Sequence, residues 1–222
     1  MKAAEHPLYG DANLTRFVSQ WHLQQGHTVL QLFQLGRSGE RSHALELLRL
    51  TDPPQGARVL SLGCGIGGVE AYWRQARPDL SFELVNISQE QLDLCQCKGY
   101  KVCADAQGYA SPNAPFDVVL LGYLLGHVDM HETLTAALDN CEPGGRIVIV
   151  DVFDVSARFR QVMCYDPPTF AAIEWWCAAS LLRLRRVVEG GAELQLVPFI
   201  ADAAPWVERE ATPGLFVLEV PA

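Results

Sequence analysis

The stretch VLSLGCGIGG, residues 59–68, decides how this chain is organised. It begins with a short apolar run that is typical of a buried strand, and a loop containing four glycines follows. A helical pattern resumes from Val69 to Gln75. Glycine allows positive φ and close approach of a ligand to the main chain, and the start of the next helix offers unpaired N–H groups. The stretch therefore predicts a strand, a tight ligand-binding loop and a helix. Its G-x-G-x-G spacing differs from the G-x-G-x-x-G dinucleotide pattern, although Gly65 and Gly68 leave that interpretation open.

Strands and helices alternate along the chain on the C-terminal side of this loop. Such alternation indicates βαβ units and a mostly parallel sheet. A late stretch over 170–187 has a helical pattern and precedes two closing strands. The fold expected is therefore α/β and Rossmann-like, with a mostly parallel seven-stranded sheet and helices on both faces. The expected strands are 58–62, 82–87, 102–104, 116–121, 146–152, 193–200 and 215–220, and the helices between them are 69–75, 89–98 and 130–140.

The N-terminal segment, residues 1–50, is predicted to be a helical cap. Apolar residues between Phe17 and Leu35 recur at three- and four-residue spacings, and a second helix follows from Ser42 to Leu50. No linker divides the 222 residues. We expect one domain, with the cap over 1–50, a ligand-binding core over 57–152, and a substrate-side helix with closing strands over 153–222.

Charge and cysteine content exclude several classes of protein. A net charge of -9 argues against nonspecific binding to nucleic acid and against an anionic membrane surface. The densest basic cluster, 183–186, is interpreted as the solvated face or the end of a helix. Seven cysteines without a C-x-x-C pair fit neither a zinc ribbon nor a disulfide framework, so a reducing cytoplasm is expected. The sequence has no signal-peptide pattern and no apolar run of membrane-spanning length, and we expect a soluble protein.

Four motifs in the correct order resemble those of class I S-adenosylmethionine (SAM)-dependent methyltransferases. Residues 59–67 resemble the first motif, FDVV at 116–119 the start of the fourth strand, LGHV at 125–128 the segment after it, and EPGGR at 142–146 the turn before the fifth strand. The resemblance implies SAM as the cofactor. Two residues depart from the family pattern, since the usual Asp of the first motif is Ser61 and the usual ribose-binding acid is Asn86. Asn can accept and donate a hydrogen bond but lacks the strength of a carboxylate.

The resemblance also implies which residues bind the cofactor. Asn86 corresponds to the ribose contact, and Asp105 with Ala106 to the adenine contact, and a solvated loop position is the alternative for Asp105. NISQEQ at 86–91 resembles an element of the branch that includes cyclopropane-fatty-acid synthases, sterol and tocopherol C-methyltransferases, prenyl-diphosphate methyltransferases and some natural-product methyltransferases. Ser88 and Gln91 also form a capping-box pattern, and both interpretations can hold. The cofactor residues implied are Gly63, Cys64, Gly65, Gly67, Asn86, Ile87, Gln91, Asp105, Ala106 and Gly122.

Methyl transfer needs chiefly alignment, and it needs a base only where the acceptor must lose a proton. His127, placed by the resemblance at the mouth of the cofactor pocket, is the main candidate for a base or acceptor contact. Capping or packing is the alternative for His127, and a metal site shared with His131 is a weaker one; we expect no metal. Asp129 is expected to start the next helix, with His131 and Glu132 facing solvent. Glu174 and Tyr165 are lesser base candidates.

Aromatic residues outside the motifs are candidates for binding an apolar acceptor. They are Tyr9, Trp21 and His22 in the N-terminal segment, and Trp175 and Trp176 in the late helix. Two adjacent tryptophans cannot share one helix face, so at least one of them is expected to pack or to face solvent.

The leading hypothesis is a SAM-dependent methyltransferase acting on carbon or oxygen of a small, largely apolar acceptor, such as a terpenoid, lipid-like or aromatic metabolite. An NAD(P)-linked oxidoreductase and a non-catalytic methyltransferase-like binding protein are the alternatives. A prenyl-diphosphate acceptor would need cations or a metal, for which only Arg158, Arg160 and Arg183 are available. We expect no nucleic-acid or membrane partner, and we leave a homodimer open.

Overall fold

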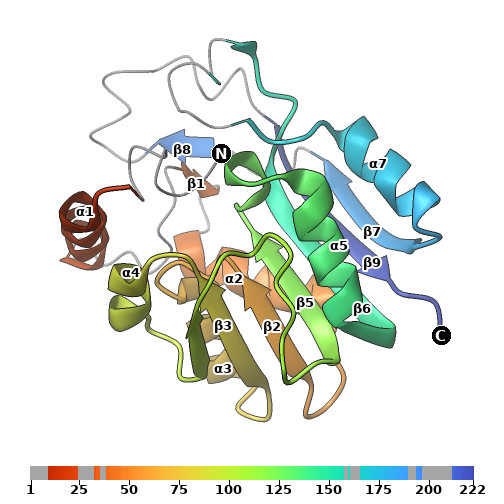
Figure 1. Cartoon of the computed structure of the whole chain (residues 1–222), viewed down its shortest axis with the longest axis horizontal. Coiled ribbons are helices and arrows are strands. Elements are labelled where there is room, and N and C mark those ends of the chain that lie inside the picture. The colour runs from red at the N-terminus through yellow and green to blue at the C-terminus, as the bar shows by residue number, and fades with distance from the viewer. Residues whose placement is uncertain are drawn as a thin grey trace.

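The main sheet of the protein has seven strands in the order β4-β3-β2-β5-β6-β9-β7. The computed structural model describes residues 10–24, 33–35, 39–157, 160, 166–189, 194–196 and 212–222. Strands β2 to β6 run parallel, and β9 lies antiparallel between β6 and β7 (Figure 1). The strands are β2 (Arg58–Leu62), β3 (Ser81–Asn86), β4 (Tyr100–Cys103), β5 (Phe116–Gly122), β6 (Cys141–Phe153), β7 (Arg183–Glu189) and β9 (Thr212–Glu219). The predicted fold class is confirmed.

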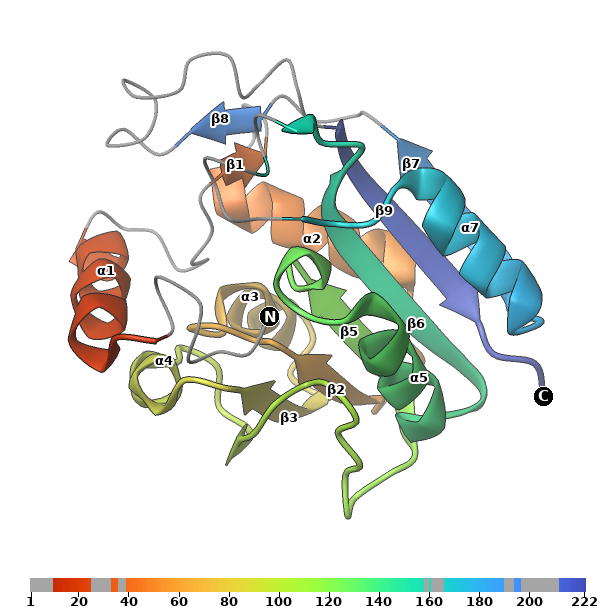
Figure 2. The same ribbon diagram turned by 45° about the horizontal axis from the view of Figure 1, so that its top comes forward.

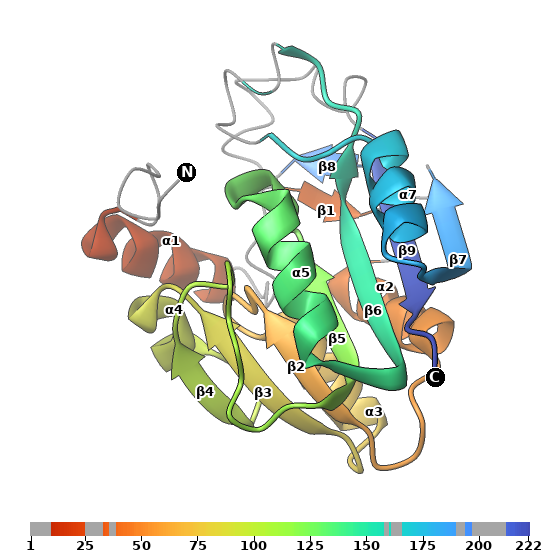
Figure 3. The ribbon, with the colours of Figure 1, turned by 45° about the vertical axis from the view of Figure 1, so that its right-hand side comes forward.

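Helices cover both faces of this sheet. The helices α2 (Gly39–Thr51) and α3 (Gly68–Ala76) lie on one face, and α5 (Met130–Asn140) and α7 (Phe170–Ala179) lie on the other (Figures 1 and 3). Side chains of β2 point alternately to the two faces of the sheet. Val59 packs in the hydrophobic core cluster under α2 and α3, whereas Leu60 and Leu62 pack in the core cluster under α5 and α7. The middle strands are thus buried on both sides, as parallel strands usually are.

The N-terminal segment divides into parts with different neighbours. Helix α1 (Ala12–Gln24) lies against α4 (Gln89–Leu94), with an ion pair between Arg16 and Asp93 at 3.9 Å (Figure 2). Helix α2 belongs to the core, because the Trp73 indole N–H of α3 donates to the Ala44 carbonyl at 2.7 Å and Ala44 is fully buried. Of the two helices described within the predicted cap, α1 therefore lies away from the main sheet and α2 packs on it.

Two predicted helical segments are strands. Phe33–Leu35 forms β1, which pairs antiparallel with β8 (Leu194–Leu196) in a separate two-stranded sheet (Figure 2). Residues 183–187 belong to β7 and pair with β9, so the basic cluster 183–186 lies on a strand. In both places pairing with a strand distant in the sequence overrides the local helical pattern. Helix α7 ends before the basic cluster, and Leu181, two residues after the end of the helix, has a positive φ of 58°.

Two more boundaries depend on contacts between elements. The predicted helix 89–98 ends at Leu94, since the Gln96 N–H donates to the Ile66 carbonyl at 2.7 Å and Cys97 is buried. The predicted strand over 193–200 is described only at 194–196, where it pairs with β1 and not with the main sheet. Among the helices that the structure describes, none combines the length and the apolar character that a membrane span requires.

Candidate functional site

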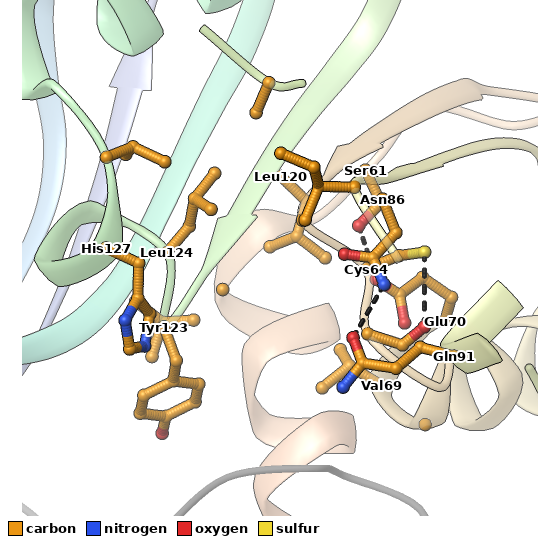
Figure 4. Close-up of a pocket in the computed structure, with 18 of the residues that line it drawn as sticks. Ser61, Cys64, Val69, Glu70, Asn86, Gln91, Leu120, Tyr123, Leu124 and His127 are labelled. Atoms are coloured by element: carbon orange, nitrogen blue, oxygen red, sulfur yellow. Dashed lines mark hydrogen bonds between the residues drawn. The ribbon is translucent and has the colours of Figure 1, made fainter. Parts of the chain in front are cut away.

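A pocket opens at the carboxyl ends of β2, β3 and β5, beside the glycine loop. Ser61, Glu70, Asn86 and Gln91 lie on one side of it, and Tyr123, Leu124 and His127 lie on the other (Figure 4). Parallel sheets commonly bind ligands at this edge. Nine of the ten predicted cofactor residues line the pocket, namely Gly63, Cys64, Gly65, Asn86, Ile87, Gln91, Asp105, Ala106 and Gly122.

The glycine loop presents two glycines to different surroundings. Gly65 has a φ of 56°, and a Cβ built on it would meet no heavy atom within 4 Å, so this residue faces the open pocket. Gly67 has a φ of 68°, and a Cβ there would lie 2.3 Å from the Cys95 Sγ. The predicted cofactor residue Gly67 thus lies against the segment after α4 and outside the pocket lining. A glycine is required at position 67 because any side chain there would clash with Cys95.

Two amides occupy the end of β3. Asn86 Nδ2 donates to Gln91 Oε1 at 2.7 Å, and both residues are buried. The Gln91 N–H donates to Ser88 Oγ at 3.3 Å, which confirms Ser88 as the N-cap of α4. Gln91 Nε2 is buried and has no hydrogen-bond partner among the described residues. A buried donor of this kind costs free energy unless a ligand accepts its hydrogen.

Asp105 and Ala106 form the rim of the pocket beyond β4. Ala106 is buried, whereas Asp105 is exposed and accepts a hydrogen bond from the Gln107 N–H at 3.0 Å. Asp105 therefore both lines the pocket, as a cofactor contact would, and lies in a solvent-exposed loop.

Glu70, in the first turn of α3, is a pocket residue that sequence reasoning missed. The Ser61 hydroxyl donates to its Oε1 at 2.5 Å, and only 3% of Glu70 is exposed. Burial raises the pKa of this carboxyl. The sequence did contain a signal for Glu70, namely Ser61 in place of the usual Asp of the first motif. A carboxylate that is missing from the strand can be supplied by the helix packed against it.

His127 lies at the end of a short 3-10 helix, η2 (Leu125–His127), and lines the pocket half-buried. The buried Asp151 of β6 holds this segment, since its Oδ2 accepts from the Leu125 N–H at 3.0 Å and its Oδ1 from the Val152 N–H at 2.8 Å. Burial raises the pKa of Asp151 to about 7.

The residues after His127 lie as predicted. Asp129 caps α5 and accepts a hydrogen bond from the Glu132 N–H at 2.9 Å. His131 and Glu132 are exposed and lie outside the pocket lining. Over the described residues, no group of three or more His, Cys, Asp and Glu side chains is placed to hold a metal ion.

Tyr123 and His43 form a second pair that the sequence did not reveal. Tyr123 follows β5 with a positive φ of 55°, lines the pocket, and has its hydroxyl 3.2 Å from His43 Nε2 of α2. Burial lowers the pKa of His43 to about 4, so its ring is neutral at pH 7. A neutral ring can accept the phenolic hydrogen. Neither residue belongs to a recognised motif, and their contact joins elements 80 residues apart.

The predicted aromatic contacts lie elsewhere. Trp176 is 3% exposed in the core cluster under α7, whereas Trp175 is 70% exposed, as adjacent residues of one helix must diverge. Glu174 is exposed beside them. Trp21 and His22 of α1 stack edge to face, with ring centroids 5.3 Å apart, and do not line the pocket. Tyr9 and Tyr165 lie outside the described residues.

A family model described as a methyltransferase domain matches residues 36–187, which is most of the chain. The chain belongs to this methyltransferase family. The oxidoreductase alternative is therefore wrong, and SAM is the cofactor of this domain, as the motif series implied.

The methyltransferase has curated relatives over part of its length. It is similar to the cyclopropane-fatty-acyl-phospholipid synthases of two Escherichia coli strains, with 36% identity over 95 residues. This match covers 40% of the chain and 25% of the relatives, so the chain spans about a quarter of the length of those proteins.

Solved structures similar to the methyltransferase show the same fold. A geranyl diphosphate C-methyltransferase from Streptomyces coelicolor has 13% identity and a TM-score of 0.74, over 98% of this chain and 99% of the other. A cyclase, SpnF, has 13% identity and a TM-score of 0.76, over 95% of both chains. A cyclopropane synthase from Mycobacterium tuberculosis has 15% identity and a TM-score of 0.66, over 80% and 83%. At these identities the similarity concerns the fold alone, and one of the three proteins is a cyclase.

The residues of the pocket fit SAM. The cofactor carries ribose hydroxyls, which can accept the hydrogen of the unpartnered Gln91 Nε2. Gly65 leaves its main chain open to close approach, and Gly63 and Gly122 also line the pocket.

Proposed function

We propose that this methyltransferase transfers a methyl group from SAM to carbon or oxygen of a small, largely apolar acceptor. The observation that carries this proposal is the division of the pocket into two ends. The groups that fit the nucleoside lie around the glycine loop and β3, and Tyr123, Leu124 and His127 lie on the opposite side (Figure 4), with Val128 also in the lining. The Tyr123 hydroxyl is engaged by His43, so His127 is the polar side chain on this side that remains for an acceptor with a single reacting group.

SAM supplies an electrophilic methyl group on a positively charged sulfur. The chain has to hold the two reactants in line and to exclude water, which can contribute much of the rate enhancement. The glycine loop with Asn86 and Gln91 would hold the nucleoside, while the apolar wall would orient the acceptor. His127 would contact the acceptor or take a proton from it where the acceptor is a hydroxyl.

An uncharged acceptor is favoured over a diphosphate. Arg160 pairs with Asp166 at 3.0 Å, and Arg183 is an exposed partner of Glu219 at 4.0 Å. Neither arginine lines the pocket, and Arg158 lies outside the described residues. The lining itself contains no Lys or Arg. The similar enzyme from Streptomyces coelicolor was solved with Mg²⁺ and a diphosphate analogue, and among the residues described here no group of cations in the pocket lining supports such an acceptor.

Incubation with methyl-labelled SAM and a panel of acceptors tests the proposal. The panel contains a prenyl alcohol, geranyl diphosphate with and without Mg²⁺, a phospholipid with unsaturated chains, and a phenol. We expect transfer to at least one uncharged acceptor, and we expect His127→Ala to lower that rate at least tenfold with unchanged affinity for S-adenosylhomocysteine (SAH). His131→Ala, four residues along and exposed, is the matched control. Tight SAH binding without transfer to any acceptor would indicate a non-catalytic binding protein.

A further inference from the structure

Glu70 is a buried acid in the wall of the pocket that has no cationic partner among the described residues. The Ser61 hydroxyl, at 2.5 Å, is its side-chain hydrogen-bond donor, and 97% of the residue is shielded from solvent. Burial is the largest influence on its pKa and raises it, and the hydrogen bond from Ser61 opposes this effect. A buried carboxylate without a counter-charge is unfavourable, so this site favours the arrival of a cation.

The other titratable groups around Glu70 do not provide that cation. Three thiols face it, from the glycine loop (Cys64) and from the segment after α4 (Cys95 and Cys97). Burial raises the pKa of Cys97 to about 12, and the contact with Cys95 together with burial raises the pKa of Cys64. The same contact lowers the pKa of Cys95. None of the three can carry a positive charge.

Two basic side chains, Arg74 and Lys101, act electrostatically on Cys97 but are engaged elsewhere. Arg74 donates to the Leu80 carbonyl at 3.0 Å, and Lys101 donates to the Leu92 carbonyl at 2.9 Å. Neither lines the pocket. Among the described residues none supplies a positive charge next to Glu70, which leaves the ligand as its source.

The cofactor brings such a charge. The amino-acid end of SAM carries an α-ammonium group, and SAH retains it after the methyl group has left. Two carboxylates line the pocket, and Asp105 is exposed at the rim and bonded to Gln107. Glu70 is the buried one, where a charge-assisted hydrogen bond is least weakened by water.

We propose that Glu70, oriented by the Ser61 hydroxyl, is the carboxylate that binds the α-ammonium group of the cofactor. This inference rests on the proposed function, since it takes SAM as the ligand. It adds a proton linkage. Where free Glu70 is protonated, binding of the ammonium group ionises it and releases one proton to the solvent.

Two ligands separate this contact from the rest of the cofactor site. SAH carries the ammonium group, and 5′-methylthioadenosine has the same nucleoside and sulfur without the amino-acid end. We expect Glu70→Gln to weaken SAH binding 10- to 100-fold and to leave methylthioadenosine binding within twofold, measured by isothermal titration calorimetry. Glu132→Gln is the matched control, because Glu132 is also the third residue of its helix but is exposed outside the pocket. It should change neither affinity.

A transplanted carboxylate tests the position of the charge. Since the side chains of residues 61 and 70 are in hydrogen-bond contact, the double variant Ser61→Asp, Glu70→Ser places the acid at the same point from the strand. We expect it to recover most of the SAH affinity that Glu70→Gln loses. Titration of the wild type with SAH in two buffers of different ionisation enthalpy, repeated over a range of pH, should show proton release wherever free Glu70 is protonated, and Glu70→Gln should show none.

The outcomes distinguish the two proposals. If the wild type binds neither SAH nor methylthioadenosine, the proposed function fails and this inference fails with it. If the wild type binds SAH and Glu70→Gln binds it equally well, the inference alone is overturned. A loss of affinity for both ligands in Glu70→Gln would also overturn it, because a general disturbance of the pocket would then explain the effect.

Discussion

At the carboxyl end of β3, the amide groups of Asn86 and Gln91 bind each other and leave Gln91 Nε2 buried without a hydrogen-bond partner in the described part of the chain. A pair of neutral amides satisfies itself only in part. A carboxylate at position 86 would accept from Gln91 Nε2 after rotation of that amide and would also accept from a ligand hydroxyl. We therefore expect this amide pair to bind a ligand hydroxyl less strongly than a carboxylate would.

Asn86→Asp should therefore tighten binding of SAH by roughly 5- to 20-fold, because hydrogen bonds to a charged acceptor are stronger than those between neutral groups. Calorimetric titration at pH 7.5 measures this change. Gln89→Glu makes the same amide-to-acid change on the exposed face of α4 and should leave the affinity unchanged. Weaker binding by Asn86→Asp would contradict the assignment of a hydroxyl-bearing ligand to this end of the pocket.

At the scale of elements, the glycine loop is held between β2 and the segment after α4. The Gly67 N–H donates to the Cys64 carbonyl at 2.9 Å, and the Gln96 N–H donates to the Ile66 carbonyl at 2.7 Å. One side of the loop is therefore packed against protein, while the side at Gly65 faces the pocket. Substitutions on the two sides should have different consequences.

Gly67→Ala should lower the free energy of unfolding by about 2–4 kcal/mol, since it adds both a positive-φ penalty and a clash with the Cys95 thiol. Gly65→Ala should lower it by only about 1–2 kcal/mol but should weaken SAH binding more strongly than its stability loss suggests. Urea unfolding and calorimetric titration of both variants provide the comparison. Equal losses of stability would be inconsistent with the packing described for Gly67.

Strand β6 and η2 are joined through the buried carboxyl of Asp151. Its pKa is raised to about 7 from the usual 3.8, so between about pH 4 and pH 7 the folded protein binds more protons at this group than the unfolded chain does. The contribution of Asp151 to the free energy of unfolding is therefore highest at low pH and falls as the pH rises from about 4 to about 7.

Asp151→Asn should remove this contribution to the pH dependence. We expect the wild type to lose on the order of 2–4 kcal/mol from this group between pH 5 and pH 8, with no such loss in the variant. The difference in free energy of unfolding between the wild type and Asp151→Asn should therefore change in favour of the variant as the pH rises. Urea unfolding of both proteins at the two pH values measures the difference, and a gap independent of pH would show that Asp151 does not titrate in this range.

For the molecule as a whole, local patterns predicted the strand–loop–helix core because each element there forms from residues close in sequence. The bounds of α5 and of β2 match the sequence-based ones. β1 and β7 were missed, since Phe33–Leu35 and Arg183–Glu189 become strands only by pairing with partners far along the chain. Propensity cannot report such partners.

The same distinction applies to the site. The glycine loop, Asn86 and His127 were found because motifs place them at fixed offsets from strands. Glu70 and Tyr123 were not, since their importance lies in contacts with Ser61 and His43 on other elements. Assignment of roles to all the lining residues, and the division into cap, core and substrate-side segments, remain predictions.

A stabilisation experiment on the whole protein tests the cofactor independently of catalysis. SAH at 100 times its dissociation constant should stabilise the fold by about 2.7 kcal/mol, which corresponds to a rise in Tm of roughly 5–10 °C for a chain of this size. NADH at the same concentration should give no shift. A shift with NADH and none with SAH would overturn the cofactor assignment.

The pocket draws its lining from both hydrophobic cores. Leu120 and Val150 belong to the cluster under α2 and α3, whereas Ala106 belongs to the cluster under α5 and α7. A bound ligand therefore contacts side chains from both faces of the sheet and makes the opening of either face more costly. Amide hydrogen exchange should slow in β2 and β5 and also in α3 and η2, so that one small molecule protects backbone on both sides of the sheet at once.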